Sequence, residues 1–304
     1  MASTTEIAHE FAPFLRVYTD GRVERLLTTP RLPPSTDPIT GVQSKDIVIS
    51  TEIDVKSRIF LPKIDPTDPP RNLPLIVYIH GGGFCIGSPI NIITQGFLTP
   101  FVSQIPSVTI AVGYRLAPEH SLPTAYHDCW AAFNWIAAHA NGSGPDPWIN
   151  EYVDTSRVIL VGESAGANLA HYVAVQAGVH KIGLGIRALI AIHPYFSQEE
   201  PDKLIQYLYP GSSGSTDDPK LNPGSDSDLD KMACPRVLII VAEKDSLKPR
   251  GVEYNETLRK SKWEGKVELV ENEGEGHCFH LFNPSSEKAK DLTQMLISFV
   301  NQVA

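Results

Sequence analysis

Runs of apolar residues recur along the chain, and they predict the strands of a sheet. Within most of these runs Val and Ile stand at both odd and even positions, so we expect both faces of the strands to be buried. The runs span residues 45–51, 57–63, 73–80, 108–116, 156–162, 186–194, 236–244 and 266–271.

Helical patterns lie between and after these strands. Residues 125–140 place a broad apolar side on one face, 167–177 follow a serine-containing turn, and 285–302 open with a serine cap. The apolar side of the first of these helices is formed by Trp130, Phe133, Trp135 and Ile136. Strands that alternate with helices are typical of an α/β fold with a mostly parallel sheet.

Two further segments fall outside this alternation. Residues 14–27 carry Asp20-Gly21 between two alternating runs, which predicts a β-hairpin. Residues 197–230 are rich in Gly, Pro, Ser and Asp and contain one short apolar patch at 204–208. This stretch is either a surface excursion that covers a site or a long exposed loop.

Length and charge limit the classes of protein to consider. A chain of 304 residues can bury a large core, and we expect one domain over 1–304, with contributions to a cap from about 1–25 and 197–230. The formal net charge of −9 argues against nucleic acid or an anionic membrane as the main partner.

The chain also lacks the features of an exported or membrane protein. Its first residues do not combine a basic start with an apolar core, and no run approaches the ~18 apolar residues of a membrane span. The cysteines are widely spaced and form no CxxC pair, so we expect free thiols in a reducing compartment, the cytoplasm. They are Cys85, Cys129, Cys234 and Cys278.

The clearest chemical candidate is a serine between a strand and a helix. Gly162, Glu163, Ser164, Ala165 and Gly166 follow a buried run and precede helix formers. A serine on such a sharp turn presents its hydroxyl above the sheet, and glycines two residues away on either side relieve crowding there. Ser164 is therefore a candidate nucleophile.

A serine nucleophile needs a base, and the base needs an orienting carboxylate. On this kind of sheet the acid and then the histidine should follow later strands. Asp245 lies three residues past one apolar run, and His277 lies in a loop after the last strand. Glu243 is the rival acid, and His280 is the rival base, although the apolar residues after it favour a packing or helix-start role.

Acyl transfer also needs hydrogen-bond donors for a developing oxyanion. His80, Gly81, Gly82 and Gly83 end a strand, and the N–H of Ala165 completes a set of backbone donors. Neither the dinucleotide nor the P-loop glycine pattern is present, which weakens a nucleotide alternative. The HCFH stretch at 277–280 fits no usual zinc spacing, so we expect no metal.

These motifs together resemble the hormone-sensitive-lipase-like α/β-hydrolases. The likeness is carried by HGGG at 80–83, YRLAPEH at 114–120, GESAG at 162–166, and Asp245 with His277. FLRVYTDGRVERLL at 14–27, GVQSKDIVI at 41–49 and DPWINEYVD at 146–154 resemble the plant carboxylesterase branch of that family.

The resemblance implies an α/β-hydrolase fold and a serine carboxylesterase that cleaves small-molecule esters through an acyl-enzyme, without a cofactor. Its implied catalytic residues are Ser164 as nucleophile, His277 as base and Asp245 as orienter. The implied oxyanion donors are Gly82, Gly83 and Ala165, with His80 shaping the loop. Phe84, Cys85, Ile86 and Phe279 flank these groups and either line an apolar pocket for a short acyl group or serve as packing.

The same branch contains proteins that are not esterases, so the key positions must be compared with theirs. Gibberellin receptors of the branch lose the histidine that His277 retains, and dehydratases typically carry threonine where Ser164 stands. An esterase is therefore favoured, a lyase, cyclase or dehydratase is the alternative, and a receptor is least expected. The chain departs from the family in a shortened segment at 197–216, which leaves the size of the pocket and the identity of the substrate open. The sequence does not indicate the oligomeric state either.

Overall fold

The computed structural model describes residues 6–50, 53–65, 72–196, 202–214 and 216–304. At its centre is an eight-stranded sheet in the order β11-β10-β9-β8-β6-β7-β5-β4. The strands are β4 (Gln43–Ser50), β5 (Ile53–Leu61), β6 (Leu73–Ile79), β7 (Val108–Val112), β8 (Val153–Glu163), β9 (Ile186–Ile192), β10 (Arg236–Ala242) and β11 (Lys266–Asn272). Strands β6 to β11 run parallel, whereas β5 pairs antiparallel with both β7 and β4. The predicted α/β fold with a mostly parallel sheet is confirmed.

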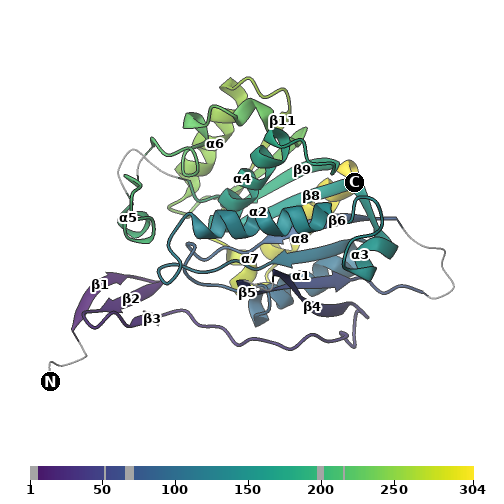
Figure 1. Cartoon of the computed structure of the whole chain (residues 1–304), viewed down its shortest axis with the longest axis horizontal. Helices are drawn as coiled ribbons and strands as arrows, with labels where there is room; N and C mark the ends of the chain where they lie inside the picture. The colour runs from purple at the N-terminus through teal and green to yellow at the C-terminus, as the bar shows by residue number, and fades with distance from the viewer. Residues whose placement is uncertain (1–5, 51–52, 66–71, 197–201, 215) are drawn as a thin grey trace.

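Helices cover both faces of this sheet (Figure 1). In β6, Leu75 and Val77 are buried toward one layer, while Ile76 and Tyr78 are buried toward the other. The first layer holds α2 (Thr124–Ala137), α3 (Pro147–Tyr152), α4 (Ala165–Val179) and α6 (Lys248–Lys260). The second holds α1 (Ile92–Gln104), α7 (Phe279–Phe282) and α8 (Glu287–Val303). Two buried faces explain why the strands are apolar at both parities.

The three predicted helices are present as α2, α4 and α8. On the predicted apolar side of α2, Phe133 and Ile136 are buried, whereas Trp130 and Trp135 are only partly buried against the same core. Helix α8 begins after Ser286, whose hydroxyl accepts a hydrogen bond from the Ala289 N–H at 3.1 Å. Among the helices of the described residues, none is both long and apolar enough to cross a membrane.

A small antiparallel sheet stands apart from the central one. It consists of β1 (Ile7–Phe11), β2 (Leu15–Tyr18) and β3 (Val23–Arg25), and Asp20-Gly21 forms the predicted turn between the last two strands. Leu15 packs in one cluster with Leu204 and Leu208 of α5 (Lys203–Leu208) and with Cys85. The hairpin and α5 lie at the same end of the molecule (Figure 1).

The segment at 197–230, for which the sequence predicts either a surface excursion or a long loop, is partly helical in its described part. After α5 come two short 3-10 turns, η1 (Pro223–Ser225) and η2 (Leu229–Lys231). Residues 197–201 and 215 of this stretch lie outside the described residues. Because Leu204 and Leu208 are buried, the segment at α5 is packed against the rest of the protein and is not a free loop.

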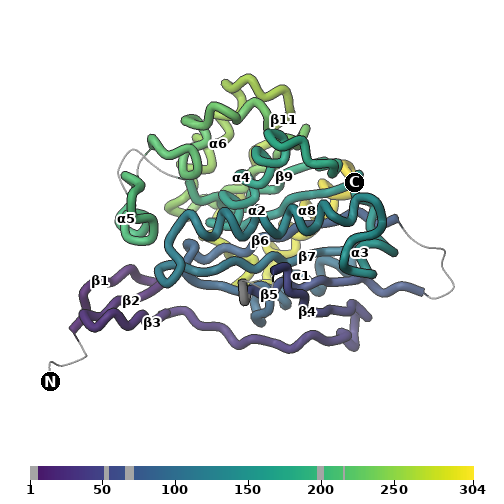
Figure 2. The backbone as a smooth tube through the Cα atoms, viewed as in Figure 1, coloured from purple at the N-terminus to yellow at the C-terminus, as the bar shows by residue number. Residues whose placement is uncertain are grey.

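An extended segment connects the hairpin to β4 along one side of the molecule (Figure 2). Its Leu32 N–H donates to the Ile90 carbonyl at 2.8 Å, and its Leu32 carbonyl accepts from Arg58 at 2.7 Å. Arg58 is fully buried in β5, where its guanidinium also donates to Asp46 at 2.7 Å. This one side chain thus fastens the N-terminal segment to the central sheet.

We predict that Arg58→Met lowers the free energy of unfolding by about 3–5 kcal/mol, because the change leaves the Asp46 carboxylate without its buried partner. The measurement is chemical denaturation followed by circular dichroism. Arg16→Met is the matched control, since Arg16 and Glu10 form an ion pair of 2.7 Å whose side chains are 37% and 44% exposed. That control should cost no more than about 1 kcal/mol, and equal losses in the two variants would contradict the prediction.

Candidate active site

Polar side chains gather where five neighbouring parallel strands end. Strands β6, β8, β9, β10 and β11 are followed by His80, Ser164, His193, Asp245 and His277, respectively. Ligands of open α/β sheets bind outside the carboxyl ends of the strands. The order of the strands therefore brings all the polar groups predicted from the sequence to the same end of the sheet, where the strands have their carboxyl ends.

Ser164 occupies a strained turn between β8 and α4. Its φ of 52° and ψ of −122° are unusual for a residue with a side chain. The Ser164 N–H donates to the Ile192 carbonyl at 2.8 Å, and the Ser164 carbonyl accepts from the Tyr195 N–H at 3.1 Å. The end of β9 thus holds the turn on both sides, and the serine is 6% exposed.

The two glycines around the serine are required by close approach. A Cβ on Gly162 would lie 2.2 Å from the Gly166 carbonyl oxygen, and one on Gly166 would lie 2.1 Å from the oxygen of Ile79. Real Cβ atoms do not come this near to backbone atoms. Glycine at both positions therefore lets α4 start directly against the end of β6.

Asp245 and His277 form a hydrogen-bonded pair. The distance from His277 Nδ1 to Asp245 Oδ2 is 2.6 Å, and the other carboxylate oxygen accepts from the Leu247 N–H at 2.8 Å. Burial alone would raise the pKa of Asp245, but the hydrogen bond and charge of His277 outweigh it, so the pKa lies below its usual value of 3.8. An ionised carboxylate can only accept, so His277 carries a proton on Nδ1 and its Nε2 is free to act as a base.

Both rival residues lie elsewhere. Glu243 is exposed, and its carboxylate accepts from the Gly274 N–H at 2.6 Å. His280 is buried in α7, where its ring packs edge-on against Phe97 with centroids 5.2 Å apart. Its Nε2 is 3.7 Å from the buried carboxylate of Glu163. The geometry thus favours Asp245 and His277 over the rivals.

The pair and the serine lie at the carboxyl ends of strands in the same part of the sheet, but they are not hydrogen-bonded to each other. Among the contacts between described residues, no hydrogen bond joins the Ser164 hydroxyl to His277. The His277 side chain is 36% exposed, so its ring has an open side. Such contacts commonly shorten only when a substrate is bound.

The glycine loop after β6 lies against the serine turn. A Cβ on Gly81 would be 3.1 Å from the Ser164 Cβ, and Gly82 and Gly83 adopt φ values of +110° and +57°. Among the backbone hydrogen bonds of the described residues, none is donated by the N–H of Gly82 or of Gly83. The Ala165 N–H opens α4, where the first amides of a helix have no partner within it.

His80 lies beneath this glycine loop and is buried. Its ring stacks on Tyr114 with centroids 4.3 Å apart, and the Tyr114 hydroxyl donates to the His80 carbonyl at 2.9 Å. Burial lowers the pKa of His80, with smaller opposing contributions from Gly81 and Glu163. The geometry fits a residue that shapes the loop.

The four flanking residues occupy different environments. Phe84 is fully buried at φ 62°, between the rings of Tyr126 and Tyr195. Cys85 is buried in the cluster under the hairpin, and burial raises the pKa of its thiol to about 12. Phe279 is buried in the second helix layer, whereas Ile86 is partly exposed and lines a hollow of about 480 Å³ with Leu27 and Leu116. Packing accounts for the positions of Phe84, Cys85 and Phe279.

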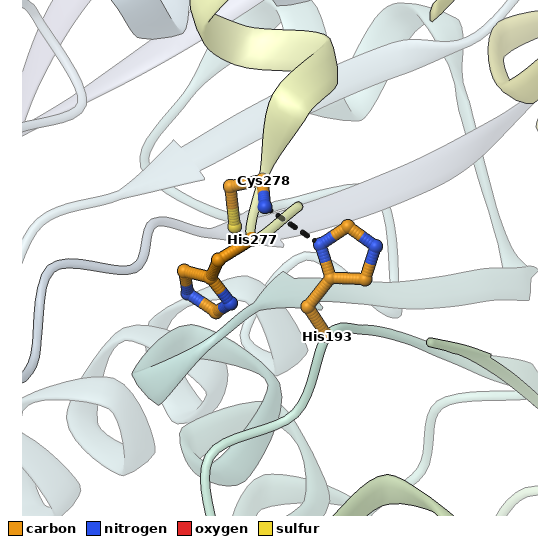
Figure 3. Close-up of side chains that lie close together, drawn as sticks. All are labelled: His193, His277 and Cys278. Carbon is orange, nitrogen blue, oxygen red and sulfur yellow. Dashed lines mark hydrogen bonds between the residues drawn. The ribbon is translucent and has the colours of Figure 1, made fainter. Parts of the chain in front are cut away.

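Three potential metal ligands lie close together at this end of the sheet: His193, His277 and Cys278 (Figure 3). Their nearest ligand atoms are within 4.8 Å of one another. However, His277 Nδ1 donates to Asp245, and His193 Nδ1 accepts from the Cys278 N–H at 2.8 Å. Burial raises the pKa of the Cys278 thiol well above its usual value, which disfavours the thiolate that a metal needs. The cluster is better described as hydrogen-bonded packing around His277.

His193 is not among the candidates predicted from the sequence. It follows β9, the strand between those that carry Ser164 and Asp245, and its ring centroid is 5.7 Å from that of His277. The available signal was its place after an apolar run, at the same edge as the other candidates. Nothing in the sequence indicated its positive φ of 46°.

Comparison with known proteins agrees with the fold. A family model described as the alpha/beta hydrolase fold matches residues 76–281. Probable carboxylesterase 5 of Arabidopsis thaliana is 42% identical over 97% of this chain and 99% of its own length. The 2-hydroxyisoflavanone dehydratase of Glycyrrhiza echinata is 38% identical over 99% of this chain and 100% of its own. Among solved structures, the hyperthermophilic esterase from the archaeon Pyrobaculum calidifontis has a TM-score of 0.70 and 25% identity over 86% of this chain and 87% of its own.

We predict that Gly166→Ala destabilises the protein by about 3 kcal/mol, because the new methyl group would overlap the Ile79 carbonyl. Thermal and chemical unfolding would measure the loss. Gly183→Ala is the control, since a Cβ there meets nothing within 4 Å, and it should change stability by less than ~0.5 kcal/mol. A Gly166→Ala protein as stable as the control would show that α4 does not need this approach.

Proposed function

The chain belongs to the α/β-hydrolase fold family, in its plant carboxylesterase branch, and from this premise we propose that Ser164, His277 and Asp245 carry out the hydrolysis of small-molecule carboxylic esters. The protein is a carboxylic ester hydrolase. One observation supports the assignment of residues most strongly. The His277–Asp245 hydrogen bond of 2.6 Å lies at the same sheet edge as the strained Ser164 turn and the glycine loop.

In the first half of the reaction the serine hydroxyl attacks the ester carbonyl. His277 Nε2 takes the hydroxyl proton, and Asp245 holds the ring in the tautomer that leaves this nitrogen free. The N–H groups of Gly82, Gly83 and Ala165 donate hydrogen bonds to the oxyanion of the tetrahedral intermediate. Each such donor is expected to lower the barrier by about 3 kcal/mol.

In the second half, His277 gives its proton to the leaving alcohol, and an acyl-enzyme remains on Ser164. A water molecule attacks the acyl carbon while the same histidine takes its proton. The bond from the acyl carbon to the Ser164 oxygen then breaks, His277 returns the proton to that oxygen, and the carboxylic acid is released. A side chain of this protein gives or accepts the proton in every transfer, so the proposed mechanism needs no cofactor and no metal.

The hairpin and α5 form the cover of this site in our proposal. A Cβ on Gly83 would lie 3.4 Å from Leu204 Cδ2 and from the ring of Phe14. These two apolar side chains stand next to an oxyanion donor, so we expect them to contact the substrate. A short apolar acyl group would fit beside them.

We further propose that the protein acts in the cytoplasm without a nucleic-acid partner. Its cysteines are free and buried, which suits a reducing compartment. The net charge of −9 disfavours binding to polyanions.

Hydrolysis of a p-nitrophenyl acyl series from acetate to dodecanoate, with parallel labelling by a fluorophosphonate, tests the function. We expect serine-dependent turnover that is fastest with short acyl chains, and a loss on the order of 10⁶-fold in kcat for Ser164→Ala. Labelling without ester turnover would instead favour a dehydratase-like or lyase reaction, for which the Glycyrrhiza relative is the precedent.

A second prediction separates the two candidate acids. Asp245→Asn should fold and lower kcat by about 10⁴-fold, because an amide at this position favours the wrong His277 tautomer. Glu243→Gln is the matched control and should keep near-normal kcat, since Glu243 bonds only to a loop amide among its described contacts. The reverse pattern, with Glu243→Gln inactive, would refute the assignment of the acid.

A further inference from the structure

The residue that directly follows His277 has an unusual backbone conformation. Cys278, directly after the base, has a φ of 50° and a ψ of 32°. A side chain of this kind seldom adopts the left-handed region, and strained residues persist only where their surroundings fix them. What fixes this turn therefore also fixes the direction of His277.

The Cys278 N–H donates to His193 Nδ1 at 2.8 Å, and both groups are buried (Figure 3). His193 is itself held from its own side. Its N–H donates to the Ile240 carbonyl at 2.8 Å, and its φ is 46°. The hydrogen bond thus joins two strained residues, one after β9 and one after β11, across the strand that carries Asp245.

From this geometry we infer that His193 is a positioning residue for the base: its Nδ1 accepts the Cys278 N–H and thereby fixes the turn that directs His277 toward Ser164. The inference rests on the proposed function, because it needs His277 to be the base. His193 does not touch the reacting atoms in this role.

The surroundings of His193 suit a permanent acceptor. Burial lowers its pKa to about 3, with His280 and His277 as further causes. A neutral ring that accepts at Nδ1 carries its proton on Nε2, so this acceptor is preserved throughout the neutral pH range. The ring also packs near Phe279 and His280, with centroids 6.0 Å from each, so it cannot swing freely.

Without this acceptor, the buried Cys278 N–H would have no partner, and the turn could relax into an ordinary conformation. A displacement of the base by about 1 Å is enough to reduce the rate roughly 100-fold. The loss should fall on kcat, because substrate binding depends on the glycine loop and the cover and not on this turn.

Three substitutions at His193 test the role of the acceptor. In His193→Asn the side-chain oxygen can reach the position of Nδ1, in His193→Gln it reaches only the region of Nε2, and His193→Leu has no acceptor. With p-nitrophenyl acetate we expect about 100-fold lower kcat for the Leu and Gln variants, with KM within about twofold. The Asn variant should recover at least tenfold of that loss.

His171→Leu is the matched control. His171 is also buried, and its Nδ1 is hydrogen-bonded to the Tyr254 hydroxyl at 2.8 Å, away from the base. It should lower the thermal midpoint as His193→Leu does, yet leave kcat within about twofold of wild type. A loss of kcat in this control equal to that in His193→Leu would mean that general destabilisation is the cause, and the proposal would fail.

Two further results would overturn the inference: a folded His193→Leu protein with kcat within threefold of wild type, or Asn and Gln variants of equal kcat. If His193→Leu does not fold, the comparison of Asn with Gln decides alone. The rate of fluorophosphonate labelling of Ser164 is measured on every variant, because it requires the base but no ester turnover. A wild-type protein that labels but does not hydrolyse esters would refute the proposed function, and the labelling rates would still judge His193.

Discussion

The close approach of α4 to the end of β6 is the constraint on which the site depends. Only glycine at 162 and 166 permits it, and Ser164 between them has a strained conformation. The turn is held in place because the Ser164 N–H bonds to the last residue of β9 and the Ser164 carbonyl bonds to the segment after it. The serine therefore stands at the carboxyl end of the sheet, and the first residue of α4, Ala165, directly follows it.

Backbone strain is concentrated around this edge. Of the five non-glycine residues with positive φ among those the structure describes, four surround the site, and only Lys181 lies away from it. The four are Phe84, Ser164, His193 and Cys278. Each lies directly after a strand or in a loop that follows one. Burial of the neighbouring rings and hydrogen bonds between strand ends hold these conformations in place.

The sheet and the polar groups at its edge could be predicted because their signals are local. Ser164 and Asp245 follow strands that are buried on both faces and apolar at both parities, whereas His277 follows an edge strand in which apolar and charged residues alternate. Helix α6 could not be predicted, since most of its residues are polar, and α1 is interrupted by Pro100. The environments of Phe84 and Cys85 could not be predicted either. Phe84 has a positive φ, and these two neighbouring residues are buried in different cores.

The hairpin and α5 share a buried cluster with Cys85, which is only two residues from Gly83. The other buried members of this cluster, which shares no residue with the two cores of the central sheet, are Leu15, Val17, Ala117, Leu204 and Leu208. Ile205 of the same helix α5 is buried in the first core of the central sheet, so this cluster is also tied to the main core. A change in the volume of one of these side chains is therefore transmitted to the glycine loop, and the shape of this end of the molecule cannot vary independently of the loop geometry.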